Sequence, residues 1–199
     1  MPTEVRPLHV GDTFGEGATG PVYAYALFHP DGLVLVDTGM IDRHPEIEEH
    51  FRPTLRPLTE HGLPLDEVRL VINTHLHFDH CGGNRLFPGV PIYVQRAERE
   101  AARAPDYTIR EWVEFEGAEY VELEGEAEIL PGIRVLPTPG HTPGHQSVLV
   151  DTDEGLVIIG GDVAHTLDDL RGERRLLDLE PRRIWITHAH EPFPDGGAP

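Results

Sequence analysis

A cluster of histidine and aspartate residues is the first feature of this sequence that could support chemistry. His75, His77, Asp79 and His80 directly follow an apolar segment at residues 69–74. Imidazole and carboxylate groups are the ligands that zinc and its first-row neighbours prefer. Residues two apart on a strand point to the same side, so His75 and His77 can reach one ion. Asp79 and His80 are adjacent and face a different point once the strand has broken into a loop. The spacing therefore predicts two neighbouring ions and favours a metal-dependent hydrolase.

Three further candidate ligands occur later in the chain. His141, Asp162 and His188 follow apolar segments at residues 133–136, 156–159 and 184–187. Binding residues collect in loops at strand ends, where they can converge without interrupting the sheet. With the first four residues they make seven candidate ligands, a number that suits two ions sharing one bridging carboxylate.

The elements that must position these residues are mainly short strands. Apolar segments separated by glycine, proline or aspartate predict strands at residues 22–28, 33–36, 70–73, 92–94, 133–136, 147–150, 156–159 and 184–187. Turn residues at 29–32 and 153–155 predict two hairpins, because proline presets one backbone angle and glycine adopts the strained one.

Helices are predicted between these strands, over residues 45–61, 95–103 and 167–179, with prolines at 53 and 57 able to divide the first. The glutamate-rich segment 114–128 is typical of an exposed edge strand guarded by charge. Strands, hairpins and helices together predict an α+β or layered α/β fold.

Length and charge narrow the class of protein. The 199 residues suit one domain, which we expect over residues 1–191, with a disordered tail at 192–199. The net charge of −19 would repel phosphate backbones, so we expect no nucleic-acid partner. Cys81 is the single cysteine, which excludes an intrachain disulfide. We find neither a secretory signal nor an apolar run long enough to span a membrane, so a cytoplasmic protein without a membrane partner is expected, of open oligomeric state.

Several motifs together carry a family resemblance: His75-Leu76-His77-Phe78-Asp79-His80, Gly140-His141, Gly161-Asp162 and the final His188. In this respect the chain resembles the metallo-β-lactamase fold superfamily. Within the superfamily it is most similar to the N-acyl homoserine lactonases, a quorum-quenching family, through segments at 35–40, 75–84, 93–98, 106–107, 128–132 and 138–147. The similarity runs from about residue 20 to 190. It implies an αβ/βα sandwich of two mixed sheets flanked by helices.

The resemblance also implies roles for the candidate ligands. One ion would be held by His75, His77 and His141, and the other by Asp79, His80 and His188, with Asp162 bridging the two. Asp37 and His145 would orient the ligand loops from outside by hydrogen bonding. Zinc is the expected metal, and iron, cobalt and manganese suit the same ligands. The implied reaction opens the ring of a small lactone, or cleaves a related ester, by attack of a metal-bridging hydroxide, with Asp79 able to transfer a proton.

Two departures from the lactonases concern the substrate side of the site. The lactonases have a tyrosine three residues after the bridging aspartate, where this chain has His165. We expect His165 to face the substrate as a hydrogen-bond donor. The connection from Asp162 to His188 is also shorter than the family's and implies a more open site.

Other functions remain open from the sequence. A thioesterase of the hydroxyacylglutathione hydrolase type and a single-iron persulfide oxygenase use similar ligands. A catalytically idle metal-binding or sensing module is a third alternative. Metal content and a panel of lactones, esters and thioesters would separate them.

Overall fold

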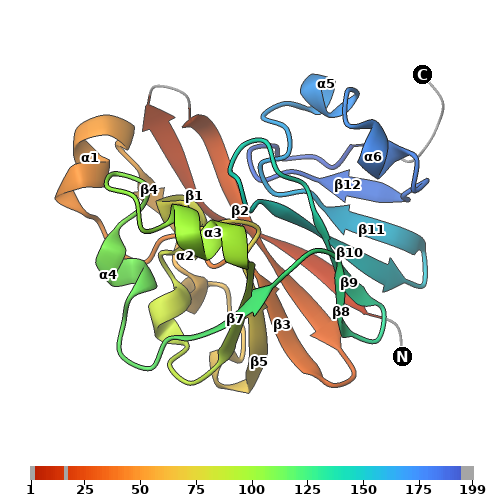
Figure 1. The fold of residues 1–199 in the computed structure, drawn as a ribbon, viewed down its shortest axis with the longest axis horizontal. Coiled ribbons are helices and arrows are strands. Elements are labelled where there is room, and N and C mark those ends of the chain that lie inside the picture. The colour runs from red at the N-terminus through yellow and green to blue at the C-terminus, as the bar shows by residue number, and fades with distance from the viewer. Residues whose placement is uncertain (1–2, 16–17, 194–199) are drawn as a thin grey trace.

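The computed structural model describes residues 3–15 and 18–193, whose strands form two sheets packed face to face (Figure 1). The first sheet has the strand order β4-β1-β2-β3-β5-β6-β7. Its strands are β1 Glu4–Gly15, β2 Ala18–His29, β3 Gly32–Val36, β4 Thr54–Leu55, β5 Val68–Ile72, β6 Pro91–Gln95 and β7 Glu119–Leu123. Strands β4, β1, β2 and β3 pair antiparallel, and β3, β5, β6 and β7 pair parallel. The sheet is therefore mixed, as expected.

The second sheet has the order β12-β11-β10-β9-β8. Its strands are β8 Ala127–Leu130, β9 Ile133–Pro137, β10 Gln146–Thr152, β11 Gly155–Ile159 and β12 Arg183–Trp185. Only β11 and β12 pair parallel, so this sheet is also mixed. Both predicted hairpins are confirmed, with His29 opposite Gly32 and Thr152 opposite Gly155.

The core follows from the alternation of side chains along each strand. In β3, Val34 and Val36 point into the layer between the sheets, whereas Leu33 and Leu35 point outward under the helical segments. Both faces of this strand are buried, which explains its uninterrupted apolar sequence. Across the layer, the inner face meets side chains of the second sheet such as Val148.

Short helices cover the outer faces of the sheets. They are α1 Pro45–Phe51, α2 Phe78–Cys81, α3 Arg96–Ala101, α4 Arg110–Val113, α5 Leu167–Leu170 and α6 Arg174–Leu177. Helices α1 to α4 gather on the side of the first sheet that faces away from the second, and α5 and α6 lie beside the second sheet (Figure 1). Leu170 and Leu176 pack on the outer face of the second sheet with Ile158 and Ile184.

The first two strands were not predicted at their observed length. Strand β1 was missed, and β2 begins before the predicted residue 22, because polar residues and glycines interrupt the apolar pattern. The pairing of β1 with β2 nevertheless continues from Glu4 to Gly15, with a bulge after His9.

The segment 45–61 is divided, as its prolines allowed, into α1 and a single 3-10 turn at Leu58–Glu60, and the residues between them are not helical. Arg52 adopts a left-handed conformation with φ +37° and ends α1, and β4 then pairs with β1. The helix predicted over 167–179 is two short helices, α5 and α6, separated by residues 171–173. The segment 114–128 contributes β7 and the start of β8, which are the edge strands of the two sheets.

The expectation of a disordered tail is wrong for its first two residues. Phe193 pairs with Ile184 and packs on the second sheet, so residues 192 and 193 belong to the ordered fold. Residues 194–199 lie outside the described residues.

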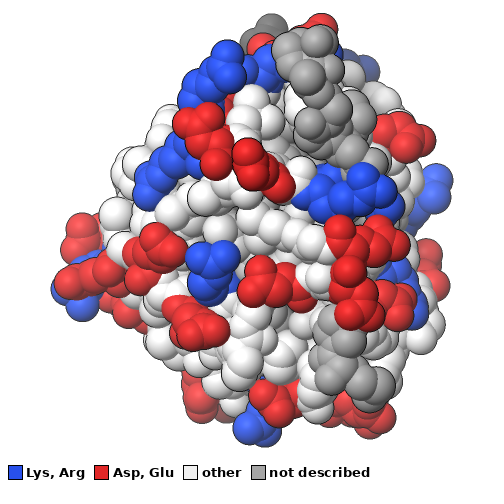
Figure 2. All heavy atoms as spheres, turned by 90° about the vertical axis from the view of Figure 1, so that its right-hand side faces the viewer, with Lys and Arg blue, Asp and Glu red and all other residues white. Residues whose placement is uncertain are grey.

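The charges on the surface are interspersed on the face shown in Figure 2, where arginines alternate with acidic side chains. Among the described residues, no helix combines the length and apolar character needed to cross a bilayer.

Candidate metal centre

The seven candidate ligands come together at one rim of the sandwich. They lie in the segments that follow β5 of the first sheet and β9, β11 and β12 of the second, with Asp79 and His80 on the short helix α2. Each loop begins where a buried strand ends, so the side chains are carried by rigid elements and point into the same region. The fold thus brings together residues that are up to 113 positions apart in the chain, from His75 to His188.

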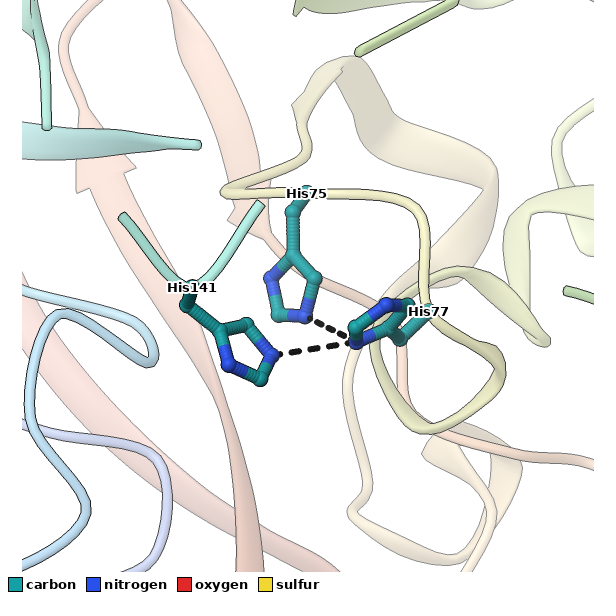
Figure 3. Close-up of side chains that lie close together, drawn as sticks. All are labelled: His75, His77 and His141. Atoms are coloured by element: carbon teal, nitrogen blue, oxygen red, sulfur yellow. Dashed lines mark hydrogen bonds between the residues drawn. The ribbon is translucent and has the colours of Figure 1, made fainter. Parts of the chain in front are cut away.

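Three histidines form the first group of donors (Figure 3). His77 Nδ1 lies 3.1 Å from His75 Nε2 and 3.0 Å from His141 Nε2. His75 is buried, whereas His141 is exposed at the rim. Three imidazole nitrogens directed at one point from three directions form a set that a single metal ion can use.

The second group consists of Asp79, His80 and His188. The Asp79 carboxylate lies 3.8 Å from His80 Nε2 and 3.9 Å from His188 Nε2.

Asp162 lies between the two groups. Its carboxylate is 3.1 Å from His188 Nε2 and 3.3 Å from His80 Nε2, and it is also 3.5 Å from His141 Nε2 in the first group. This is a position from which one carboxylate can contact two ions.

The titration behaviour of the first group favours neutral imidazoles. Burial lowers the pKa of His75 well below its ordinary value, lowers that of His77, and lowers the pKa of His141 to about 4. A neutral imidazole has a lone pair available for a metal ion.

The second group instead attracts positive charge. Burial lowers the pKa of His80 and His188, but the carboxylates of Asp162 and Asp79 outweigh it. The pKa of His80 is therefore raised well above its ordinary value, and the pKa of His188 is raised to about 9. Burial would raise the pKa of Asp162, yet His80 and His188 hold it well below its usual range. A bound cation satisfies the same demand for positive charge.

Two buried atoms also fit a metal ion. His80 Nε2 and Asp162 Oδ1 have no hydrogen-bond partner among the described residues. Buried polar atoms rarely have no hydrogen-bond partner, and these two lie 3.3 Å apart, where one cation could bind both. The imidazole and carboxylate donors match divalent first-row metals, and the residues present therefore fit the group that the sequence predicts.

Asp37 fixes the orientation of His80. Its Oδ2 accepts hydrogen bonds from His80 Nδ1 at 2.8 Å and from Thr74 Oγ1 at 2.7 Å, and its Oδ1 accepts from the Thr74 backbone N–H at 2.8 Å. Because Nδ1 donates to the carboxylate, Nε2 of the neutral ring keeps its lone pair and faces the centre. Asp37 thus contacts the candidate ligand His80 from outside the cluster, the position that the resemblance implies.

His145 acts on the backbone of Asp162. Its Nε2 accepts the Asp162 N–H at 3.0 Å, and its Nδ1 donates to the Thr138 carbonyl at 3.1 Å. Burial lowers the pKa of His145 to about 3, which keeps Nε2 available as an acceptor. Its hydrogen bonds reach the Asp162 and Thr138 backbones, whereas its contact with the loop of residues 75–80 is the packing of its ring beside that of His75, with centroids 5.4 Å apart.

His165 is exposed beside the cluster. Its ring centroid lies 5.5 Å from that of His141 and 6.2 Å from that of His188, and Asp162, His165 and His188 could also share an ion. His190 points elsewhere, with Nδ1 3.1 Å from the Tyr23 hydroxyl. Of these two neighbours on the final loop, His188 is the one that faces the centre.

Glu98 is a functional candidate that was not assigned a role from the sequence. It is fully buried, and its carboxylate bonds to both loops that carry the first group of histidines. Nothing in its local sequence distinguishes it from the exposed Glu100 two residues later.

The fold and the donor set together define the class of protein. The sequence profile of the Metallo-beta-lactamase superfamily matches residues 17–179. The chain belongs to this superfamily and is a metal-dependent hydrolase.

Comparison with individual relatives indicates a narrower family within the superfamily. The chain is 37% identical to an N-acyl homoserine lactonase of Bacillus cereus over 170 residues, which cover 77% of this chain and 68% of the relative. It is 38% identical to an N-acyl homoserine lactonase of a Bacillus species over 178 residues, or 81% of this chain and 71% of the relative. A solved N-acyl homoserine lactone hydrolase, with the product N-hexanoyl-L-homoserine bound at its catalytic metal center, superimposes with a TM-score of 0.78. That comparison covers 94% of this chain and 92% of the other, at 27% identity. The sequence-based expectations of family and fold are thereby confirmed.

Proposed function

We propose that this protein is a dinuclear-metal lactonase that opens N-acyl homoserine lactones or closely related lactones and esters. The observation that carries the proposal is the pair of donor groups that meet at the Asp162 carboxylate. The lactonase relatives supply the substrate class.

Each donor group would bind one metal ion. His75, His77 and His141 would hold one ion, and Asp79, His80 and His188 would hold the other, with Asp162 shared. We expect zinc, because imidazole and carboxylate ligands suit it. When bound, a pair of such ions polarises the substrate carbonyl and makes hydroxide available near neutral pH.

The protein's own side chains would transfer protons and orient the substrate. Asp79 is buried at the centre and can accept a proton from water and return it to the ring oxygen as that oxygen leaves. His165, at the exposed rim, can donate a hydrogen bond to the substrate carbonyl oxygen. One water is added across the acyl carbon–oxygen bond, which gives the open-chain hydroxy acid.

The test is elemental analysis of the purified protein followed by a substrate panel. We expect two equivalents of metal per chain. We also expect opening of N-hexanoyl homoserine lactone, measured through the proton that is released. Asp79→Asn should abolish most of this activity, whereas Asp66→Asn at an exposed position should not change it. Metal-replete protein that cleaves thioesters and spares lactones would replace the proposal with the thioesterase function. Protein inert to every lactone, ester and thioester would indicate a binding module.

A further inference from the structure

We propose that Glu98 is a positioning residue that fixes the two loops carrying the three-histidine group, His75, His77 and His141. The inference deepens the proposed function, on which it rests only in that this group binds a metal ion. It concerns how the ligands are held and not which substrate is cleaved.

Glu98 uses its whole acceptor capacity inside the protein. It lies on α3 with no exposed surface. Its Oε1 accepts hydrogen bonds from the Leu76 backbone N–H at 2.8 Å and from the Tyr107 hydroxyl. Its Oε2 accepts from Thr142 Oγ1 at 2.7 Å and from the Gly144 backbone N–H at 3.2 Å. A buried carboxylate is costly unless it is satisfied in this way.

The four donors flank the ligands of one group. Leu76 lies between His75 and His77 in the chain, and Thr142 directly follows His141. The Tyr107 ring packs beside the His77 ring, with centroids 4.9 Å apart. The single carboxylate therefore ties the loop after β5 to the loop after β9, which are the two loops that supply this group.

Close packing reinforces the same junction. A side chain at Gly144 would overlap the backbone of Glu98, so the loop after β9 lies directly against α3. Helix α3 and the two ligand loops therefore cannot shift independently.

Thr74 Oγ1 touches both groups, at 3.2 Å from His75 Nδ1 and 3.3 Å from His80 Nδ1, but the other supports of the second group are different. His80 is held by Asp37, and His188 donates from Nδ1 to the Pro21 carbonyl at 2.9 Å. None of the four donors to Glu98 is adjacent in sequence to Asp79, His80 or His188. Loss of the Glu98 carboxylate should consequently weaken one metal site and leave the other nearly unchanged.

A carboxylate is required at position 98 because all four partners are donors. Glutamine has the same shape but carries one donor group. In either orientation of the amide, its NH2 faces the backbone N–H of Leu76 or of Gly144, and a backbone N–H cannot reverse its role. Hydroxyl groups of Tyr107 and Thr142 can rotate, but the backbone groups cannot.

The test is stepwise zinc binding to the full chain, measured by competition with a chromophoric chelator and without substrate. Glu98→Gln should weaken one of the two equivalents by about 10–100-fold, as is typical for groups that orient metal ligands, and change the other by less than about twofold. Glu100→Gln, the same substitution at an exposed position of the same helix, should leave both equivalents unchanged.

Double variants assign the affected site. In a His188→Ala background the effect of Glu98→Gln should persist in full, whereas in a His141→Ala background it should disappear. If Glu98→Gln does not fold, the double variant Tyr107→Phe, Thr142→Val keeps the carboxylate and its backbone partners but removes both hydroxyl donors. It should weaken the same equivalent by roughly 3–10-fold, at the low end of such effects.

Three results would overturn the inference: Glu98→Gln binding both ions like Glu100→Gln, equal weakening of both equivalents, or unchanged binding by the hydroxyl double variant. Lactonase activity does not enter these measurements. A protein that fails to open lactones but shows the asymmetric zinc effect refutes the proposed function and leaves the role of Glu98 intact.

Discussion

Replacing Gly161 with alanine perturbs the centre at a crowded backbone position. Gly161 precedes Asp162 and has φ +60°, a left-handed conformation. An added Cβ would lie 2.8 Å from His145 Nε2 and 2.8 Å from Thr74 Cβ. Neither neighbour can move freely, because His145 Nε2 holds the Asp162 N–H and the Thr74 hydroxyl donates to Asp37.

The expected cost has two parts. The left-handed conformation of a residue with a side chain costs about 1 kcal/mol, and overpacking of a buried site adds about 1–3 kcal/mol. A total of about 3 kcal/mol should lower the melting temperature by roughly 6–12 °C in a protein of this size. Zinc affinity should fall as well, because the Cβ displaces the hydrogen bond that holds the Asp162 backbone.

Gly62 provides the matched control. It has a similar φ of +65°, but an added Cβ would meet nothing within 4 Å. Gly62→Ala should therefore lose only the conformational part, about 2–4 °C. The assay is thermal unfolding followed by circular dichroism, with zinc and after chelation. If Gly161→Ala melted at the same temperature as Gly62→Ala, the packing argument for this loop would be refuted.

Three other perturbations address single side chains. Asp37→Asn should weaken zinc binding by about 10–100-fold, because the new amide NH2 faces either the imidazole N–H of His80 or the backbone N–H of Thr74. Competition with a chelator measures the zinc affinity. Equal affinity of Asp37→Asn and the control Asp42→Asn, at an exposed position, would contradict this prediction. His165→Phe should retain its metal, as measured by elemental analysis, but its kcat for lactones should fall roughly tenfold because one hydrogen bond is lost. An unchanged kcat would show that His165 does not contact the substrate carbonyl. Burial raises the pKa of the Cys81 thiol from 9.0 to about 12, so thiol reagents at pH 8 should label the protein only after unfolding. The thiol of the unfolded chain ionises at lower pH than the buried thiol, so the free energy of unfolding should decrease by about 1.4 kcal/mol per pH unit between the two pKa values. Cys81→Ala should flatten this slope. Rapid labelling of the native protein would contradict the burial of Cys81.

The candidate ligands were predictable because their signal is local. Each follows an apolar strand, and the residue types themselves identify the chemistry. His188 could be chosen over His190 for the same reason, since it directly follows the apolar segment. Strand ends in a layered fold converge, so short-range patterns were enough to propose a common site.

Features that depend on distant contacts were not predictable. Strand β1 exists because β2 pairs with it, whereas its own sequence mixes glycine and polar residues. Pro53 indicated a possible break after α1, but the left-handed conformation of Arg52 and the pairing of β4 with β1 depend on distant contacts. Glu98 and Glu100 look equivalent in sequence, and only the loops that fold over α3 bury Glu98.

The origin of the ligands in both sheets has a mechanical consequence. His75, His77, Asp79 and His80 extend from one half of the sandwich, and His141, Asp162 and His188 extend from the other. A cation held by both sets acts as a clamp across the seam, and at a free concentration 1,000 times its dissociation constant it adds about 4 kcal/mol against unfolding. We therefore expect the supply of metal to set the resistance of the protein to proteases as well as its activity.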